Sequence, residues 1–258
     1  MAFDSRPTRR RFGGLAGTTL GALVAGGACR AFGWSASASD SSGRIAARPS
    51  AGATTTAQGS KNLGLDTRRD ALLQMPGDVS EPVPLLVLLH GAGGGGARML
   101  QRIAPAVDAA KIAVLAPDSR GPTWDAIGGE FGEDVEFLNR ALARVFATVA
   151  VDPARLTLGG FSDGATYALS LGLINGDLFP RVIAFSPGFV VRGQTHGQPR
   201  FFISHGTSDP ILPIDGASRT IVPALRGRGY DVTYHEFDGK HEVPPAIATE
   251  AMTWATAR

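Results

Sequence analysis

Residues 156–168 read LTLGGFSDGATYA, and this stretch decides the fold expected for the chain. Its apolar start predicts a buried strand, and apolar residues recur at helical spacing after Gly164. Ser162 lies on the sharp turn between them, where Gly160 and Gly164 avoid the collision that side chains would cause. We therefore predict a nucleophile elbow, in which the Ser162 hydroxyl projects over the end of a sheet and the backbone N–H of Asp163 is free to bind an oxyanion.

The rest of the sequence alternates predicted strands with predicted helices. After a hairpin over residues 63–75, strands are expected at 83–89, 112–116, 182–186, 200–204 and 232–237, and helices at 99–111, 133–150, 216–227 and from 242 onward. Residues 83–89 are nearly all branched and apolar, which is typical of a parallel strand covered on both faces. Because such alternation connects through right-handed crossovers, we predict an α/β fold, a mainly parallel doubly wound sheet with helices on both faces.

The first sixty residues differ in composition from the rest. Three arginines at 9–11 precede Phe12 and an uncharged stretch, a pattern that resembles a twin-arginine export signal. The stretch is short and glycine-rich for a transmembrane anchor. We expect residues 1–38 to be a cleaved export signal with its cleavage site at 36–38, residues 39–60 to be a flexible linker poor in apolar side chains, and residues 61–258 to be the catalytic domain.

The only cysteine, Cys29, resembles a lipoprotein processing site, although Gly26 replaces the usual branched residue. We therefore expect export to the periplasm or the medium, with membrane attachment only through a lipid anchor on Cys29. The domain that follows has no cysteine, so no thiol competes with Ser162 as nucleophile. Residues 1–38 hold five arginines and one aspartate, which leaves the remaining chain with a net charge of −2 and argues against nucleic-acid binding.

A serine hydroxyl becomes a strong nucleophile only when a base takes its proton and an acid orients that base. Asp209 lies just past the strand at 200–204, and His241 follows the last strand by a few residues. We predict Ser162 as the nucleophile, His241 as the base and Asp209 as the acid, in the chain order Ser, Asp, His.

The other candidates for base and acid are less well placed along the chain: His196, His205, His235, Asp215 and Asp238. His205 ends the strand that leads to Asp209 and is expected to be a hydrogen-bonded structural residue. His235 lies in the middle of a strand and would face a sheet surface rather than the elbow.

A histidine and a run of glycines, HGAGGGG at residues 90–96, follow the buried strand at 83–89. No Gly-Lys-Ser/Thr comes after them, so a phosphate-binding P-loop is not expected. After a strand of a hydrolase, the His-Gly-x-Gly-Gly form supplies a second oxyanion donor, here the N–H of Ala92, while His90 orients the loop. Trp124 either caps the core or forms a wall of the substrate pocket, and we predict that it binds substrate.

Together these motifs resemble the phospholipase/carboxylesterase group of α/β-hydrolases. The resemblance covers the chain from about Asn62 to the end and rests on Leu89-His90-Gly91-x-Gly93-Gly94, Gly160-Phe161-Ser162-x-Gly164, His205-Gly206-x-x-Asp209-x-x-x-Pro213, Gly239-x-His241 and Trp124-Asp125. It implies an α/β-hydrolase fold and hydrolysis of carboxylic esters or thioesters by a small enzyme without a large lid. The chain departs from the group at Asp163, where glutamine is frequent, and we expect only the N–H of this residue to take part.

The function predicted from the sequence is acyl transfer from a small-molecule ester to water, through an acyl-enzyme on Ser162. This reaction requires no metal and no organic cofactor, and none is expected. The acidic residues at 133–136 favour the dipole of a helix start rather than form a metal site. A peptidase or an acyl-carbohydrate esterase on the same fold stays open, since loops build the substrate pocket. A non-catalytic binding module is the alternative from another class.

Overall fold

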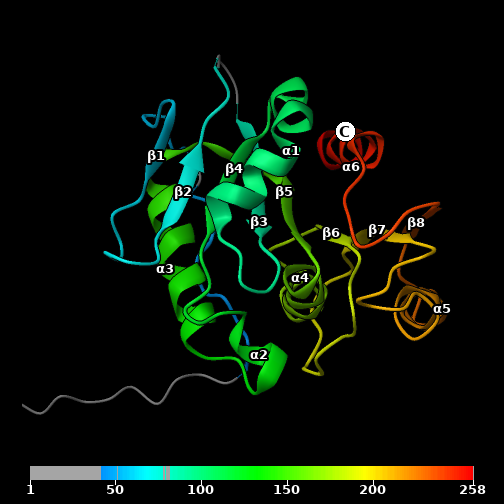
Figure 1. Ribbon diagram of the computed structural model, residues 1–258. Coiled ribbons are helices and arrows are strands. Elements are labelled where there is room, and N and C mark those ends of the chain that lie inside the picture. The colour runs from blue at the N-terminus through cyan, green and yellow to red at the C-terminus, as the bar shows by residue number, and fades with distance from the viewer. Residues whose placement is uncertain (1–41, 51, 78, 80–81, 258) are drawn as a thin grey trace, which may run out of the picture. The chain divides into compact units, whose positions relative to one another are not determined.

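The computed structural model describes residues 42–50, 52–77, 79 and 82–257, which build an eight-stranded sheet with helices on both faces (Figure 1). Neighbouring strands follow the order β1-β2-β4-β3-β5-β6-β7-β8. They are β1 (Ser60–Asn62), β2 (Ala71–Gln74), β3 (Val83–Leu89), β4 (Ala113–Pro117), β5 (Val151–Phe161), β6 (Arg181–Phe185), β7 (Arg200–Gly206) and β8 (Val232–Phe237). Strands β3 to β8 pair in parallel, and β1 and β2 pair antiparallel, so the predicted α/β fold is confirmed.

Six helices cover this sheet in the described part of the chain: α1 (Gly96–Ala110), α2 (Asp125–Gly128), α3 (Glu133–Thr148), α4 (Asp163–Ile174), α5 (Ser218–Gly227) and α6 (Pro245–Thr256). Helices α1 and α6 pack on one face, and α3, α4 and α5 pack on the other. Successive residues of β3 face the two cores in turn, with Leu85 and Val87 in one and Leu86 in the other. This burial on both sides explains why β3 is apolar throughout.

The amino-terminal hairpin begins earlier than the sequence predicts. Its first strand is β1, at residues 60–62, rather than a strand at 63–65. Gly64 has a φ of +70°, and the Asp70 carboxylate accepts hydrogen bonds from the N–H groups of Gly64 and Leu65. These contacts bend the chain, so residues 63–65 form the connection between the two strands.

Residues 42–60 correct the expectation of a flexible linker, because their described part lies along the folded domain. Ile45 is only 1% exposed, and its N–H donates to the side-chain oxygen of Asn175 at 2.9 Å. Arg44 forms a two-pronged ion pair with Asp177, with N–O distances of 2.7 and 2.9 Å. Two buried apolar side chains, Ile45 and Ala57, and several polar contacts therefore hold a segment whose composition predicts a tether.

The predicted export signal at residues 1–38, with its cleavage site and Cys29, lies outside the described residues. In the part that is described, none of the helices has the length and apolar character needed to cross a membrane. The same part of the chain holds no group of three or more His, Cys, Asp or Glu side chains arranged to bind a metal ion.

Candidate active site

Ser162 lies at the junction of β5 and α4, on a turn that only glycine neighbours permit. Its φ of +58° and ψ of −122° are strained for a residue with a side chain, and its N–H donates to the carbonyl oxygen of Phe185 in β6. A β-carbon at Gly160 would lie 2.3 Å from the carbonyl oxygen of Gly164. A β-carbon at Gly164 would lie 2.4 Å from the carbonyl oxygen of Leu89. The strand, turn and helix expected around the serine are therefore present.

Ser162, His241 and Asp209 form one hydrogen-bonded chain. Ser162 Oγ lies 2.8 Å from His241 Nε2, and His241 Nδ1 lies 2.6 Å from Asp209 Oδ2. A carboxylate only accepts hydrogen bonds, so Nδ1 donates to it and Nε2 of the neutral ring accepts from the serine hydroxyl. The loops after β5, β7 and β8 bring the three residues together, because the carboxyl ends of these parallel strands meet at one edge of the sheet.

The Asp209 carboxylate is fixed by its own loop. Its Oδ1 accepts the N–H groups of Ile211 at 2.8 Å and Leu212 at 2.9 Å. Burial raises the pKa of Asp209, but the hydrogen bonds from Leu212, the His241 ring and Ile211 outweigh it and hold the pKa below its usual value. The group is therefore ionised at neutral pH and able to orient His241.

His205 is a structural residue that supports Asp209. Its buried ring places Nε2 2.8 Å from the carbonyl oxygen of Leu212 and 3.2 Å from Asp209 Oδ2. Its Nδ1 lies 2.7 Å from Ser218 Oγ. Because a carbonyl oxygen only accepts, Nε2 carries the proton and Nδ1 accepts from the serine hydroxyl. Burial lowers the pKa of His205, so the ring stays neutral and anchors the loop instead of competing as the base.

Two other residues weighed in the sequence analysis have partners of their own. His235 stacks on Phe202 with ring centroids 5.0 Å apart, and its Nε2 lies 3.0 Å from a carboxylate oxygen of Glu250. Asp215 pairs with Arg219 at 2.7 Å. Neither contact involves Ser162.

The two expected oxyanion donors, Ala92 and Asp163, lie on the loops that follow β3 and β5. Neither backbone N–H donates a hydrogen bond to another residue among those that the structure describes. The loop after β3 approaches the serine closely, since a β-carbon at Gly91 would lie 3.1 Å from Ser162 Cβ. The Asp163 carboxylate accepts a hydrogen bond from the Thr123 hydroxyl at an O–O distance of 2.6 Å, so a donor of the protein stabilises it.

Trp124 is a core residue, and the prediction that it binds substrate is wrong. Its side chain is 1% exposed and packs between His90 and Tyr167, at ring-centroid distances of 5.0 and 5.2 Å. The indole N–H donates to the carbonyl oxygen of His90 at 2.8 Å. His90 Nε2 in turn accepts the N–H of Ser119 at 3.0 Å, which ties the glycine loop to the loop after β4. Trp124 therefore supports the loop that carries Ala92 from within the core.

A pair of aspartates that sequence reasoning missed closes the loop between β4 and α3. Asp125 accepts the hydroxyl of Tyr167 at 2.8 Å and the N–H of Asp134 at 2.9 Å. Asp134 accepts the N–H of Asp125 at 2.7 Å and that of Arg120 at 2.6 Å. Burial raises the pKa of Asp134 to about 6. The helix-start position of Asp134 gives no signal of this reciprocal pairing.

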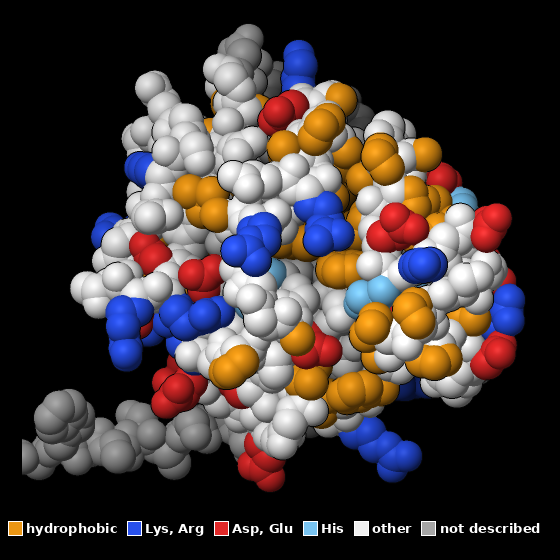
Figure 2. Space-filling model, in the orientation of Figure 1, with side chains coloured by type: hydrophobic (Ala, Val, Ile, Leu, Met, Phe, Trp, Pro, Cys, Tyr) orange, Lys and Arg blue, Asp and Glu red, His pale blue; other side chains and the backbone are white. Residues whose placement is uncertain are grey.

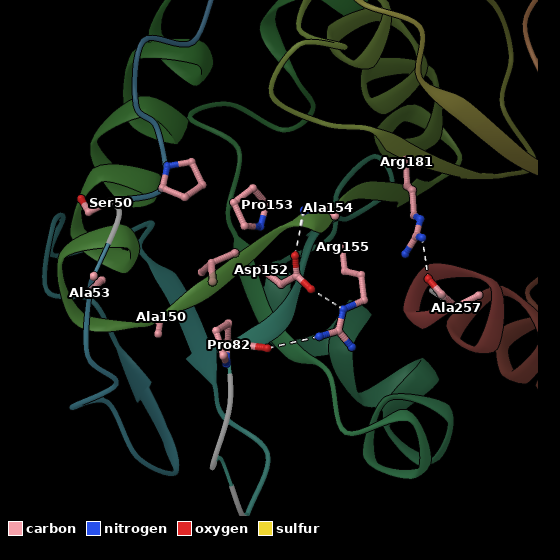
Figure 3. A pocket seen from close by; sticks show the side chains of 13 residues that line it. Ser50, Ala53, Pro82, Ala150, Asp152, Pro153, Ala154, Arg155, Arg181 and Ala257 are labelled. Atoms are coloured by element: carbon pink, nitrogen blue, oxygen red, sulfur yellow. Dashed lines mark hydrogen bonds and ion pairs between the residues drawn. The ribbon is translucent and has the colours of Figure 1, made fainter.

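A cavity of about 760 Å³ lies at the amino-terminal ends of the strands, where β3, β5 and β6 begin and opposite the end that carries Ser162 (Figure 3). Its charged side chains are satisfied within the protein, since Arg155 pairs with Asp152 at 2.6 Å and Arg181 donates to the carbonyl oxygen of Ala257 at 2.5 Å. Open parallel sheets bind ligands at the carboxyl ends of their strands. The candidate active site is therefore the edge that carries Ser162, although this cavity is large.

A mainly parallel sheet with serine, aspartate and histidine at the carboxyl ends of its strands defines an α/β-hydrolase. Comparison with known families agrees with this class. Residues 134–254 match the phospholipase/carboxylesterase family, and the fold of the chain is that of an α/β-hydrolase.

Individual relatives extend the comparison. The sequence is 30% identical over 184 residues to NocK, a candidate esterase of Nocardia uniformis subsp. tsuyamanensis, and the match covers 66% of this chain and 53% of NocK. It is 28% identical over 158 residues to feruloyl esterase C of Emericella nidulans, covering 57% of each chain. The chain thus spans about half the length of the curated relatives it matches. The crystal structure of esterase PE8 shares the fold, with a TM-score of 0.59, 24% identity, and coverage of 73% of this chain and 98% of PE8.

Proposed function

We propose that the protein is a serine hydrolase that cleaves carboxylic esters, or thioesters, through an acyl-enzyme on Ser162. The observation that carries the proposal is the pair of hydrogen bonds, 2.8 and 2.6 Å long, that joins Ser162 to His241 and His241 to Asp209. The esterase names among the relatives support the same chemistry. The reaction as written requires no metal and no organic cofactor.

In the first half-reaction, His241 Nε2 takes the proton of Ser162 while Oγ attacks the carbonyl carbon of the ester. The carbonyl electrons move onto oxygen, and the N–H groups of Ala92 and Asp163 stabilise that oxyanion. Asp209 stabilises the imidazolium through its bond to Nδ1. When the tetrahedral intermediate collapses, the alcohol leaves with the proton from Nε2 and the acyl group stays on Ser162.

The second half-reaction repeats these steps with water. His241 takes a proton from the water molecule as its oxygen attacks the acyl carbon, and the same two N–H groups hold the oxyanion. Collapse of this intermediate returns the proton to Ser162 Oγ and releases the carboxylic acid. The ring nitrogen serves as base and then as acid in each half, so His241 must be neutral before substrate binds.

Acyl-carbohydrate esters with an aromatic acyl group are the second candidate substrate class. The name of the relative feruloyl esterase C supports it, as do two large apolar side chains at the carboxyl edge of the sheet. Ile211 is 64% exposed and lies two residues after Asp209, and Phe189 is 46% exposed in the loop after β6. Exposed apolar side chains near a reaction centre offer a contact surface for an aromatic or alkyl group.

The reactive serine is tested by labelling the intact chain with a fluorophosphonate and by assaying 4-nitrophenyl esters of increasing acyl length. We expect labelling of Ser162 and ester turnover in the wild type, and loss of both in Ser162→Ala, with turnover lower by several orders of magnitude. Ser60→Ala is the matched control, because Ser60 is exposed on the edge strand β1. Ordinary turnover in Ser162→Ala would overturn the proposal, and an unlabelled wild type would indicate a binding module.

Turnover of matched peptide amides that is lost in Ser162→Ala would instead indicate a peptidase. The amine of an amide must be protonated before it leaves, whereas 4-nitrophenolate leaves as an anion, so an esterase is expected to hydrolyse the esters and leave the amides intact. Comparing kcat/KM for the two panels separates these reactions on one scaffold.

We also propose that residues 1–38 direct export, so that the domain acts outside the cytoplasm either free or anchored at Cys29. The paired arginines before an uncharged stretch support this. Fractionation of a bacterial host that expresses the full chain tests it. Retention of the chain in the cytoplasm with an intact amino terminus, unaffected by replacing Arg9 and Arg10 with lysine, would refute the proposal.

A further inference from the structure

Two arginines without acidic partners border a pocket beside the glycine loop. Arg98 and Arg102 lie one turn apart on α1, and both are exposed. Together with residues 91–95 and Phe161 they line a cavity of about 160 Å³. Neither guanidinium forms an ion pair with any residue that the structure describes, whereas Arg48, Arg200 and Arg219, which are also exposed, each pair with a carboxylate. Other exposed arginines, such as Arg144, are unpaired too, but they do not line this pocket.

This pocket adjoins the proposed catalytic groups. The guanidinium carbon of Arg102 lies 5.1 Å from the centroid of the Phe161 ring, and that centroid lies 4.7 Å from the centroid of the His241 ring. The guanidinium is therefore within about 10 Å of the imidazole. Ala92, whose N–H is proposed to bind the oxyanion, lines the same pocket.

Two carboxylates on neighbouring loops, those of Asp118 and Asp163, already accept hydrogen bonds. Asp118 Oδ1 accepts the N–H of Gly96 at 2.8 Å, and Asp163 accepts the hydroxyl of Thr123 at 2.6 Å. The two guanidinium charges thus remain available to a ligand. Figure 2 shows Lys and Arg side chains beside histidine and hydrophobic side chains on the face that it presents, so cationic and apolar surfaces adjoin there.

We propose that Arg98 and Arg102 bind an anionic group on the ester substrate, such as a carboxylate. The inference deepens the proposed function and rests on it. Guanidinium groups bind carboxylates through two parallel N–H···O bonds, and two of them one helical turn apart offer a fork that a neutral ester cannot use. The Arg102 guanidinium lies within about 10 Å of the His241 ring, and an ion pair spans up to about 4 Å of that distance. A short spacer between the anion and the ester therefore fits the remaining distance.

The test compares esters that differ only in this charge. One pair is 4-nitrophenyl butyrate and mono-4-nitrophenyl succinate, which place a methyl group or a carboxylate at the end of a four-carbon acyl chain. The other is phenyl acetate and 4-acetoxybenzoate, which place the carboxylate on the leaving group. Hydrolysis by the full chain is measured as kcat/KM for the wild type, for the double variant Arg98→Gln, Arg102→Gln, and for Arg144→Gln. Arg144 is an exposed control on α3, across the sheet from α1.

We expect the anionic-to-neutral ratio of kcat/KM to fall about tenfold in the double variant for at least one pair, the sum of two exposed charge-assisted contacts. Arg144→Gln should leave the ratio unchanged, and 0.5 M salt should compress the wild-type ratio because the contacts are exposed. Arg102→Lys, combined with Arg98→Gln, keeps one charge but lacks the planar guanidinium group. Its anionic-to-neutral ratio of kcat/KM should therefore lie between those of the double Gln variant and the wild type.

A ratio that stays within about twofold of the wild type for both pairs would overturn the proposal, as would a wild type that hydrolyses only the neutral esters. If the double variant does not fold, Arg98→Gln alone decides, because this side chain is exposed and unpaired among the described residues. Failure of the proposed function is distinguishable, since then the wild type hydrolyses none of the four esters or Ser162→Ala retains the turnover.

Discussion

Replacing Asp209 with asparagine changes the charge of the site with almost no change in shape. The amide oxygen of the new side chain would still accept the N–H groups of Ile211 and Leu212, which Asp209 now binds at 2.8 and 2.9 Å. The amide NH₂ would then face His241 Nδ1, where a carboxylate oxygen now lies at 2.6 Å. To avoid two opposed donors the ring must accept at Nδ1 and carry its proton on Nε2, where it can no longer accept the proton of Ser162.

The expected fall in kcat/KM of Asp209→Asn follows from the lost negative charge and from the unproductive tautomer of His241. Unit charges about 4 Å apart attract by about 4 kcal/mol at an effective dielectric constant of about 20. At about 1.36 kcal/mol for each factor of ten, loss of this stabilisation of the imidazolium lowers the rate about 10³-fold. The cost of returning to the productive tautomer adds to that, so we expect kcat/KM to fall by about 10³- to 10⁴-fold in Asp209→Asn.

The assay is turnover of a neutral 4-nitrophenyl ester, with thermal unfolding recorded on the same samples to show that the variant is folded. Asp215→Asn is the control, because it makes the same chemical change at an exposed carboxylate that pairs with Arg219. Activity of Asp209→Asn within about tenfold of the wild type would refute the assignment of Asp209 as the acid. An equal loss in Asp215→Asn would show that the effect is one of global charge.

Three further predictions concern the support of the site. Gly164→Ala should destabilise the fold by about 3 kcal/mol or more in urea unfolding, because its β-carbon would lie 2.4 Å from a backbone oxygen, whereas Gly227→Ala meets nothing within 4 Å and should be tolerated. Trp124→Phe should lower the free energy of unfolding by about 1–3 kcal/mol, because the buried carbonyl of His90 loses its hydrogen-bond donor, while KM for a neutral ester stays unchanged. A raised KM in a variant of full stability would instead support a substrate-binding role for Trp124. Burial raises the pKa of Asp134 to about 6, above its value in the unfolded chain, so the folded state binds the extra proton between about pH 6 and 4. The stability of the wild type relative to Asp134→Asn should therefore rise by up to about 3 kcal/mol as the pH falls through that window, and a change of opposite sign in urea unfolding at pH 7 and 4.5 would contradict the cause given.

The parts of the site that the sequence predicts are those that local patterns constrain. A serine between two glycines, after an apolar strand and before a helix, has few other conformations, and the structure places Ser162 at such a junction. Asp209 and His241 follow strands, and parallel strands bring their carboxyl ends to one edge, so position along the chain predicts that these side chains meet. Strand ends carry this information because the sheet fixes them in space.

The predictions fail where contacts between residues far apart in the sequence determine the structure. Trp124 lies in a loop at the edge that binds ligands, and only the rings of His90 and Tyr167 on either side make it a core residue. Residues 42–60 are poor in apolar side chains, yet Ile45 finds a partner in Asn175, which lies 130 positions away. Composition measures the average tendency of a segment to fold, whereas one such long-range contact is invisible to it.

Stability and substrate choice reside in different parts of this site. The strained backbone of Ser162, which costs about 1–3 kcal/mol in such conformations, is sustained by the bond to Phe185 and by glycines packed against neighbouring backbone. The buried ring of His205 contacts the Asp209 carboxylate, with 3.2 Å between Nε2 and Oδ2, and supports its position. We expect changes to these groups to shift the 2.6 and 2.8 Å contacts and therefore to lower activity toward every ester alike. Arg98 and Arg102, by contrast, are exposed side chains on α1, and we expect their substitution to alter which ester is hydrolysed without destabilising the fold.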